Sequence, residues 1–153
     1  MYGAALGDMI GAPYEFDRGE KTKDFPLFTA ESTYTDDTVM TVAVVEALMD
    51  SEEESDKEIQ RSIAETMLRW GRKYPKAGYS AQYLRWLFKD HKPLDVDTVD
   101  AAMSISCIGW LYDTIDETRK MARLSAMTTH VNPDSIRGAD AVASDAVRID
   151  VRR

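Results

Sequence analysis

The chain has 153 residues, of which 44% are hydrophobic and 30% charged, a composition typical of a soluble globular protein that suits one domain over residues 1–153. Its net charge of −8 excludes binding to nucleic acid through a broad basic surface. A lone cysteine, Cys107, excludes an internal disulfide framework, and no apolar run is long enough to span a membrane. The start also lacks the features of a secretory signal, so we expect a cytoplasmic protein with no membrane partner.

The first part of the chain predicts two helices separated by a long loop. Small apolar residues predict a helix over residues 1–10, and its glycines, Gly3, Gly7 and Gly11, predict close approach of another backbone segment. Residues 36–49 are apolar nearly all round, which predicts a central and buried helix.

Apolar residues at steps of three and four predict an amphipathic helix over residues 55–74. Ser55 and Glu58 form a capping box at its start. A short helix at residues 82–89 and a longer one at residues 97–112 are predicted next. The tryptophans, which recur at helical spacing from other apolar residues, are predicted to pack in the core: Trp70, Trp86 and Trp110.

Two further helices are predicted in the last part of the chain. Thr114 and Glu117 form a second capping box, ahead of a helix that runs to about Met127. Asn132 then provides an N-cap with Pro133 at the first helical position. Because no segment alternates convincingly between apolar and polar residues, we expect an all-α fold.

The segment Thr35-Asp36-Asp37-Thr38 is the densest cluster of oxygen ligands in the chain. Hard cations such as Mg²⁺ prefer carboxylate, hydroxyl and water oxygens, and two adjacent carboxylates could each face a different metal ion. A structural role fits equally plainly, because threonine is a fair N-cap and acids in a first helical turn complement the helix dipole.

Two other residues are candidates for chemistry. Glu15 follows a small-residue helix and lies between two aromatic residues, where a carboxylate suits a general acid or base, although it also fits an ordinary surface position. His130 falls between two predicted helices, where it would either hydrogen-bond a ligand or cap a helix end.

The chain resembles the start of the ADP-ribosylglycohydrolase family (the dinitrogenase reductase-activating glycohydrolase family) in two motifs, Gly7-Asp8-x-x-Gly11-x-x-x-Glu15 and Thr35-Asp36-Asp37-Thr38-x-Met40. Further matches follow in the right order and reach to about residue 146: Trp70-Gly71, Tyr74-Pro75, Ala77-Gly78-Tyr79, Ile108-Gly109-Trp110, Thr129-His130 and Gly138-Ala139. The resemblance implies an ADP-ribosylglycohydrolase-like helical bundle, shortened at the C-terminus.

The resemblance also implies an activity and a site. It implies hydrolysis at the anomeric carbon of ADP-ribose, with an ADP-ribosylated protein or an ADP-ribose-containing small molecule as substrate. It implies that Thr35, Asp36 and Asp37 bind Mg²⁺ or Mn²⁺ and that Glu15 and Asp36 are catalytic. The residues that it places near the substrate are Gly78, Asp100, Met103 and His130.

The sequence departs from the family pattern in two places. The stretch Val99-Asp100-Ala101-Ala102-Met103-Ser104 lacks the family's Asn-Gly and arginine, and it places Asp100 either where phosphates lie in relatives or as an added metal ligand. The second metal cluster of the family, an Asp-x-Asp-Thr type motif, does not follow His130. A homodimer would cover the apolar face that a shortened bundle exposes and would lend ligands across it. The alternative is a catalytically silent binding module or a truncated fragment.

Overall fold

The computed structural model describes residues 2–16, 22–51 and 54–150. Over these residues the chain forms six α-helices and a single isolated β-bridge, between Leu94 and His130, so the predicted all-α fold is confirmed. The α-helices are α1 (Tyr2–Gly11), α2 (Asp36–Met49), α3 (Asp56–Lys73), α4 (Ala81–Arg85), α5 (Ile115–Thr129) and α6 (Pro133–Asp150). Short 3-10 or π-helical turns lie at η1 (Ala12–Tyr14), η2 (Trp86–Asp90), η3 (Val99–Ala101) and η4 (Ile108–Trp110). None of the described helices is both long and apolar enough to cross a bilayer.

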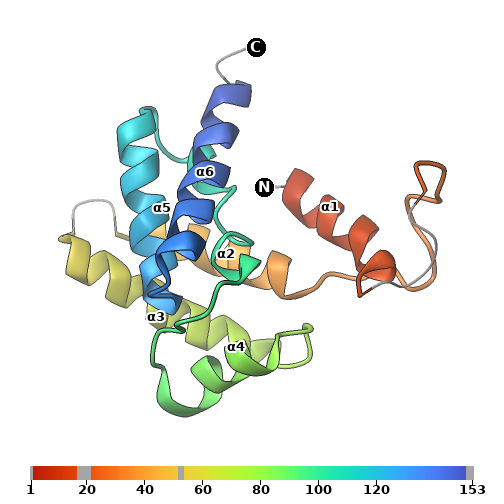
Figure 1. The fold of residues 1–153 in the computed structure, drawn as a ribbon, viewed down its shortest axis with the longest axis horizontal. Coiled ribbons are helices and arrows are strands. Elements are labelled where there is room, and N and C mark those ends of the chain that lie inside the picture. Colours follow the sequence, from red (N-terminus) through yellow and green to blue (C-terminus); the bar gives the residue numbers. More distant parts are fainter. Residues whose placement is uncertain (1, 17–21, 52–53, 151–153) are drawn as a thin grey trace.

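The core forms around α2, as its sequence predicts. α2 packs against α3, α3 packs against α5, and α5 lies beside α6 (Figure 1). Most α2 side chains are buried, and they point to several sides of the helix: Val39, Met40, Thr41, Ala43, Val44, Val45, Ala47 and Leu48. Burying each large aliphatic side chain of this kind contributes about 1.5–3 kcal/mol, which fixes the position of α2 and of the carboxylates at its start.

Side-chain caps fix the helix starts that the sequence predicts. Thr114 Oγ1 accepts a hydrogen bond from the Glu117 backbone N–H (3.3 Å), and Ser55 and Glu58 form a complete capping box. Asn132 Oδ1 accepts from the Asp134 backbone N–H at 2.9 Å, as expected for the N-cap of α6. These starts are therefore determined by local sequence as well as by packing.

The glycines of α1 do not approach another backbone segment, so that prediction is wrong. A Cβ atom added at Gly3, Gly7 or Gly11 would meet nothing within 4 Å. α1 has no buried residue, and Figure 1 shows it set apart from α5 and α6, near the start of α2. The close backbone approach occurs instead at Gly109, whereas Gly71 packs against the Leu87 side chain.

The predicted helix over residues 97–112 is also wrong. The segment contains η3 and η4 joined by turns, and its backbone bonds are of the 3-10 type, such as Ile108 N–H to the Ile105 carbonyl at 2.9 Å. Composition is one reason, because serines and a glycine interrupt the segment. Packing is the other, because Gly109 lies so close to α6 that an added Cβ would be 2.6 Å from Ala146 Cβ. Trp110 is 52% exposed, which corrects the expectation that it packs in the core.

Candidate active site

Asp8, on α1, lies against the first turn of α2 and accepts hydrogen bonds from it with both carboxylate oxygens. Oδ1 accepts from the Thr35 hydroxyl (2.7 Å), and Oδ2 accepts from the Thr35 and Thr38 backbone N–H groups (2.8 and 3.2 Å). Oδ2 also accepts from the Thr38 hydroxyl at 2.5 Å. A carboxylate suits this position because the first turn of a helix has unpaired N–H groups and the positive end of the dipole. Asp8 thereby joins α1 to the 35–38 segment.

Asp36 and Asp37 lie in the first turn of α2 and are partly buried. Burial raises the pKa of Asp36 to about 7 and that of Asp37 to about 6, and neighbouring carboxylates add to both shifts. Glu15 and Asp100 act on both residues, and Asp8 acts on Asp37. Carboxylates from α1, α2, η3 and the end of η1 are therefore within electrostatic reach of one another.

The donor atoms around Asp36 and Asp37 match a hard divalent cation. The neighbours that raise the two pKa values are all carboxylates, so a bound cation would offset charges that repel one another. Thr35 Oγ1 donates its hydrogen to Asp8 and accepts from the Asp37 N–H (3.3 Å), which leaves one lone pair for a metal ion. As the described side chains stand, however, no three carboxylate, imidazole or thiol groups are arranged closely enough to hold an ion.

The loop after α3 passes beside Asp36. Gly78 has a φ of +105°, a conformation that L side chains rarely adopt, and a Cβ added there would lie 3.5 Å from Asp36 Oδ1. Two residues later, the Ser80 hydroxyl donates to Asp100 Oδ2 at 3.2 Å. The structure thus brings together five of the predicted site residues around the start of α2: Glu15, Asp36, Asp37, Gly78 and Asp100.

Two buried tyrosine hydroxyls face the same region. The rings of Tyr79 and Tyr83 stack with centroids 5.9 Å apart, and neither hydroxyl has a hydrogen-bond partner among the described residues. Burial raises the pKa of both hydroxyls, and the charge of Asp36 adds to each shift. Because unpaired buried hydroxyls are costly, these two groups are candidates to bind a ligand or a water molecule beside Asp36.

His130 and Met103 lie at the edge of this region. His130 is fully buried at the end of α5, where Nδ1 is 2.9 Å from Thr129 Oγ1 and Nε2 is 3.2 Å from Thr98 Oγ1. Burial lowers the pKa of His130, and Asp100 opposes that shift. Met103 is partly buried against the core. The His130 backbone N–H donates to the Ala126 carbonyl at the end of α5, and the role of its ring toward a ligand stays a prediction.

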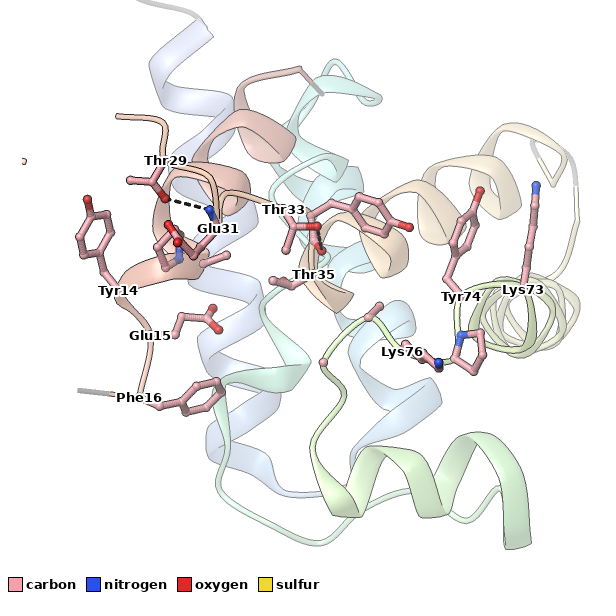
Figure 2. Close-up of a pocket in the computed structure, with 16 residues that line it drawn as sticks. Tyr14, Glu15, Phe16, Thr29, Glu31, Thr33, Thr35, Lys73, Tyr74 and Lys76 are labelled. Atoms are coloured by element: carbon pink, nitrogen blue, oxygen red, sulfur yellow. Dashed lines mark hydrogen bonds between the residues drawn. The ribbon is translucent and has the colours of Figure 1, made fainter. Parts of the chain in front are cut away.

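A pocket of about 750 Å³ is lined by Glu15, Thr35 and Gly78, whereas Asp36, Asp37 and Asp100 are not among its lining residues. This volume is in the range of about 300–1,000 Å³ that is typical of small-molecule sites. Its lining includes Tyr14, Glu15 and Phe16 on one side, Lys73, Tyr74 and Lys76 on the other, and Thr35 between them (Figure 2). One wall therefore comes from the turn after α1 and the other from the end of α3 and the following loop.

The backbone beside Glu15 is strained. Phe16 has a φ of +53°, which is uncommon for a bulky residue, and its side chain is 78% exposed. On the preceding side, the Tyr14 hydroxyl donates to the Pro26 carbonyl at 3.1 Å, which holds η1 against the following loop. Backbone strain of this kind concentrates at functional sites, where it fixes the direction of a neighbouring side chain.

The family model for ADP-ribosylglycohydrolases matches residues 1–149, nearly the whole chain. The chain belongs to the ADP-ribosylglycohydrolase family. The resemblance proposed from the Glu15 and 35–38 motifs is therefore confirmed at the level of the family and of the all-α fold.

Several curated relatives carry the name ADP-ribosylhydrolase ARH3. The chain is 28% identical to the protein from Mus musculus over 169 residues, and 26% identical to those from Bos taurus and Gallus gallus over 172 residues. Each alignment covers 91% of this chain but only 45% of the mouse and cattle proteins and 46% of the chicken protein. This ADP-ribosylglycohydrolase chain thus spans less than half the length of the curated relatives it matches.

Sequence reasoning assigned no function to several residues of the site. Asp8 belongs to the first motif, but its role depends on contacts with residues 27 and 30 positions away, which no local pattern reveals. Tyr79 lies in the loop just before α4 and Tyr83 lies within α4, so no sequence pattern indicated that their rings stack or that their hydroxyls are unpaired. Lys73 and Lys76 gave no signal beyond ordinary surface charge.

Proposed function

We propose that this chain carries the catalytic acids of a hydrolase that cleaves the N- or O-glycosidic bond between ADP-ribose and an acceptor. The observation that supports this most strongly is the convergence of Asp36 and Asp37 with Glu15 and Asp100 beside a ligand-sized pocket. Membership of the ADP-ribosylglycohydrolase family supports the choice of ADP-ribose over other glycosides.

Thr35, Asp36 and Asp37 would hold the cation, Mg²⁺ or Mn²⁺. When bound, the cation supplies positive charge for ribose hydroxyls and makes water more acidic. Asp8 keeps the Thr35 hydroxyl hydrogen turned toward itself, so that the hydroxyl oxygen is left to act as a ligand. Asp100 would supply a further oxygen ligand, because its charge acts on both Asp36 and Asp37 and raises their pKa values.

Glu15 would manage the proton of the reaction. Its carboxylate accepts a proton from the water that attacks the anomeric carbon. The bond from that carbon to the acceptor nitrogen or oxygen breaks, and the water oxygen becomes the new anomeric hydroxyl. Glu15 then passes the proton it took from the water to the departing acceptor, which regenerates its carboxylate. The products are free ADP-ribose and the unmodified acceptor. Gly78 and Met103, with His130 behind them, would line the part of the site that receives the ribose.

The second candidate function is binding of an ADP-ribosyl group without hydrolysis. The segment 99–104 lacks the Asn-Gly and arginine of the family pattern, and Asp100 adds negative charge beside Asp36 and Asp37. A chain of this kind would bind ADP-ribose and release no product.

A homodimer is a related proposal. α1 exposes large apolar side chains, with Tyr2 89% and Leu6 48% exposed, and a second copy would bury them. Light scattering that gives the mass of two chains would support this proposal, and the mass of one chain at assay concentration would exclude it. We expect the chain to act in the cytoplasm, on ADP-ribosylated protein.

The test of hydrolysis is release of ADP-ribose from arginine-linked and serine-linked peptides in Mg²⁺, compared between the wild type and Glu15→Gln. A lost proton acceptor should slow release about 10²-fold or more. Glu31→Gln is the matched control, because Glu31 lines the same pocket but is not among the charges that shift Asp36 and Asp37. Equal rates for Glu15→Gln and the wild type would remove Glu15 from the reaction, and binding without release would favour the second candidate.

A further inference from the structure

The large pocket adjoins the acid centre at Glu15 and lies outside the group of carboxylates that would hold the cation. Glu15 and Gly78 both line it, and a Cβ added at Gly78 would lie 3.5 Å from Asp36 Oδ1. The side chains of Asp36, Asp37 and Asp100, however, do not line it. The pocket is therefore next to the proposed site of bond cleavage without being the place of the cation.

The position of Glu15 determines which part of a substrate this pocket suits. In the proposed reaction the ribose lies at the cation, and Glu15 gives a proton to the departing acceptor. A proton donor must come within hydrogen-bond reach of the atom that receives the proton, so the acceptor has to lie against Glu15. The volume of about 750 Å³ is more than one side chain fills. The pocket thus has room for the modified residue and for its neighbours in the acceptor chain.

Two lysines lie on the wall of the pocket across from Glu15. Lys73 is the last residue of α3, and Lys76 lies in the loop that follows (Figure 2). Both are exposed, and neither forms an ion pair with a residue that the structure describes. This wall therefore presents two positive charges to whatever enters the pocket.

The Lys73 ammonium is held in place by aromatic rings. It lies 5.1 Å from the Trp70 ring centroid and 5.4 Å from that of Tyr74, and the two rings stack 5.5 Å apart. Trp70 is fixed in turn, because its Nε1–H donates to Glu46 Oε2 at 2.6 Å. The other oxygen of Glu46 accepts from Arg69 at 2.8 Å, so this carboxylate is already bound. A cation that is held in this way loses less freedom when it binds an anion.

We propose that Lys73 and Lys76 bind acidic residues of the acceptor protein next to the ADP-ribosylated residue, so that acidic acceptor segments are the preferred substrates of this chain. This inference rests on the proposed function and specifies its partner. Carboxylates that flank the modified residue would meet two cations across the pocket from Glu15, whereas basic residues there would meet like charges. Glu31, on the Glu15 side, favours the orientation in which the acids of the acceptor point toward the lysines.

The test is calorimetric binding, in Mg²⁺, of serine-linked ADP-ribosyl peptides that differ only in the residues flanking the modified serine. Glu15→Gln is the background, because it should bind these peptides without cleaving them. Since both lysines are exposed, the Kd should be about two- to tenfold lower for the glutamate-flanked peptide than for the lysine-flanked one. Added salt should reduce that ratio.

Lys73→Gln/Lys76→Gln, made in the same background, should remove most of this preference. Lys89→Gln/Lys92→Gln is the matched control, since these lysines have the same spacing in sequence, are exposed and lie outside the pocket. The control should keep the preference. Free ADP-ribose, which has no acceptor, is the second probe, and its Kd should be the same for both lysine variants and their background.

Each other outcome has a definite meaning. Equal affinity for the two peptides, or a preference that survives Lys73→Gln/Lys76→Gln, would overturn the inference, while normal binding of free ADP-ribose would leave the proposed function standing. Weaker binding of free ADP-ribose by Lys73→Gln/Lys76→Gln would mean that the lysines contact ADP-ribose itself, which also overturns it. If the wild type does not bind ADP-ribose, the proposed function fails and this inference fails with it.

Discussion

Asp8 shows how one side chain can support a site that it does not enter. Its two oxygens accept hydrogen bonds from the hydroxyl and backbone N–H groups of Thr35 and Thr38. The same bonds orient the Thr35 hydroxyl and fasten α1, a helix that buries no residue of its own. Because few other contacts hold α1, we expect this carboxylate to determine whether α1 stays in place.

Asp8→Asn should therefore loosen α1 specifically. The amide would turn its NH₂ group toward N–H or hydroxyl donors, which leaves hydrogen bonds unmade at a cost of about 1–3 kcal/mol. Hydrogen exchange should accelerate over residues 2–11 while α5 and α6 keep their protection. Asp24→Asn, a change at an exposed acid in the next loop, is the control. Unchanged exchange in α1 would show that other contacts hold this helix.

The raised pKa values of Asp36 and Asp37 predict a pH dependence of stability without metal. Each acid has a folded pKa above its unfolded value of 3.8, so its contribution is greatest below pH 3.8 and is lost as pH rises through about 6 to 7. Because both side chains are only partly buried, solvent screening reduces the effect to about 1–2 kcal/mol per group.

Chemical denaturation with and without Mg²⁺ measures this effect between about pH 5 and 8, the range over which the two acids ionise. Without Mg²⁺, Asp36→Asn/Asp37→Asn should be more stable than the wild type at the upper end of the range. Added Mg²⁺ should stabilise the wild type there and leave the variant unchanged. A wild type whose stability does not respond to Mg²⁺ would argue against a cation at these acids.

At the scale of elements, periodicity and caps predicted most of the helices. α2, α3, α5 and α6 begin within a residue or two of the positions that Thr35, Ser55, Thr114 and Asn132 indicate. The helix predicted over residues 97–112 was wrong, because an apolar spacing of three or four also fits successive 3-10 turns whose path is set by packing against α6.

The site could be predicted only in part, because some of its contacts depend on tertiary structure. Local chemistry singled out Thr35, Asp36 and Asp37 as oxygen ligands, and the family resemblance supplied the link to Glu15. The pairing of Asp8 with α2 and the opposing charges of the pocket walls depend on tertiary structure, so they could be read only from the fold.

Gly109→Ala and Gly138→Ala should change stability in opposite directions. A Cβ at Gly109 would lie 2.6 Å from Ala146 Cβ and 2.9 Å from the Ala143 carbonyl of α6, so overpacking should cost about 1–3 kcal/mol. A Cβ at Gly138, inside α6, meets nothing within 4 Å, and alanine there should stabilise by about 0.5–1 kcal/mol. Chemical denaturation measures both, and a neutral Gly109→Ala would mean that η4 does not pack on α6 this closely.

At the scale of the whole molecule, charge is organised around one end of α2. The chain has a net charge of −8, yet the pocket beside its acid centre presents two lysines and an aromatic surface on the facing wall. A metal ion at Asp36 and Asp37 would offset part of the negative charge of the site. The alignments cover 45% of the mouse relative, so the central question is whether this chain alone holds a metal-dependent ADP-ribose site.

The most direct measurement is calorimetric binding of ADP-ribose with and without Mg²⁺, run on the wild type and on Asp36→Asn/Asp37→Asn. Asp95→Asn/Asp113→Asn, which changes two exposed acids elsewhere, controls for the loss of charge. We predict that binding requires both Mg²⁺ and the two aspartates of α2, and that the control variant retains it. Binding that is equal with and without Mg²⁺, or no heat of binding from the wild type, would contradict it.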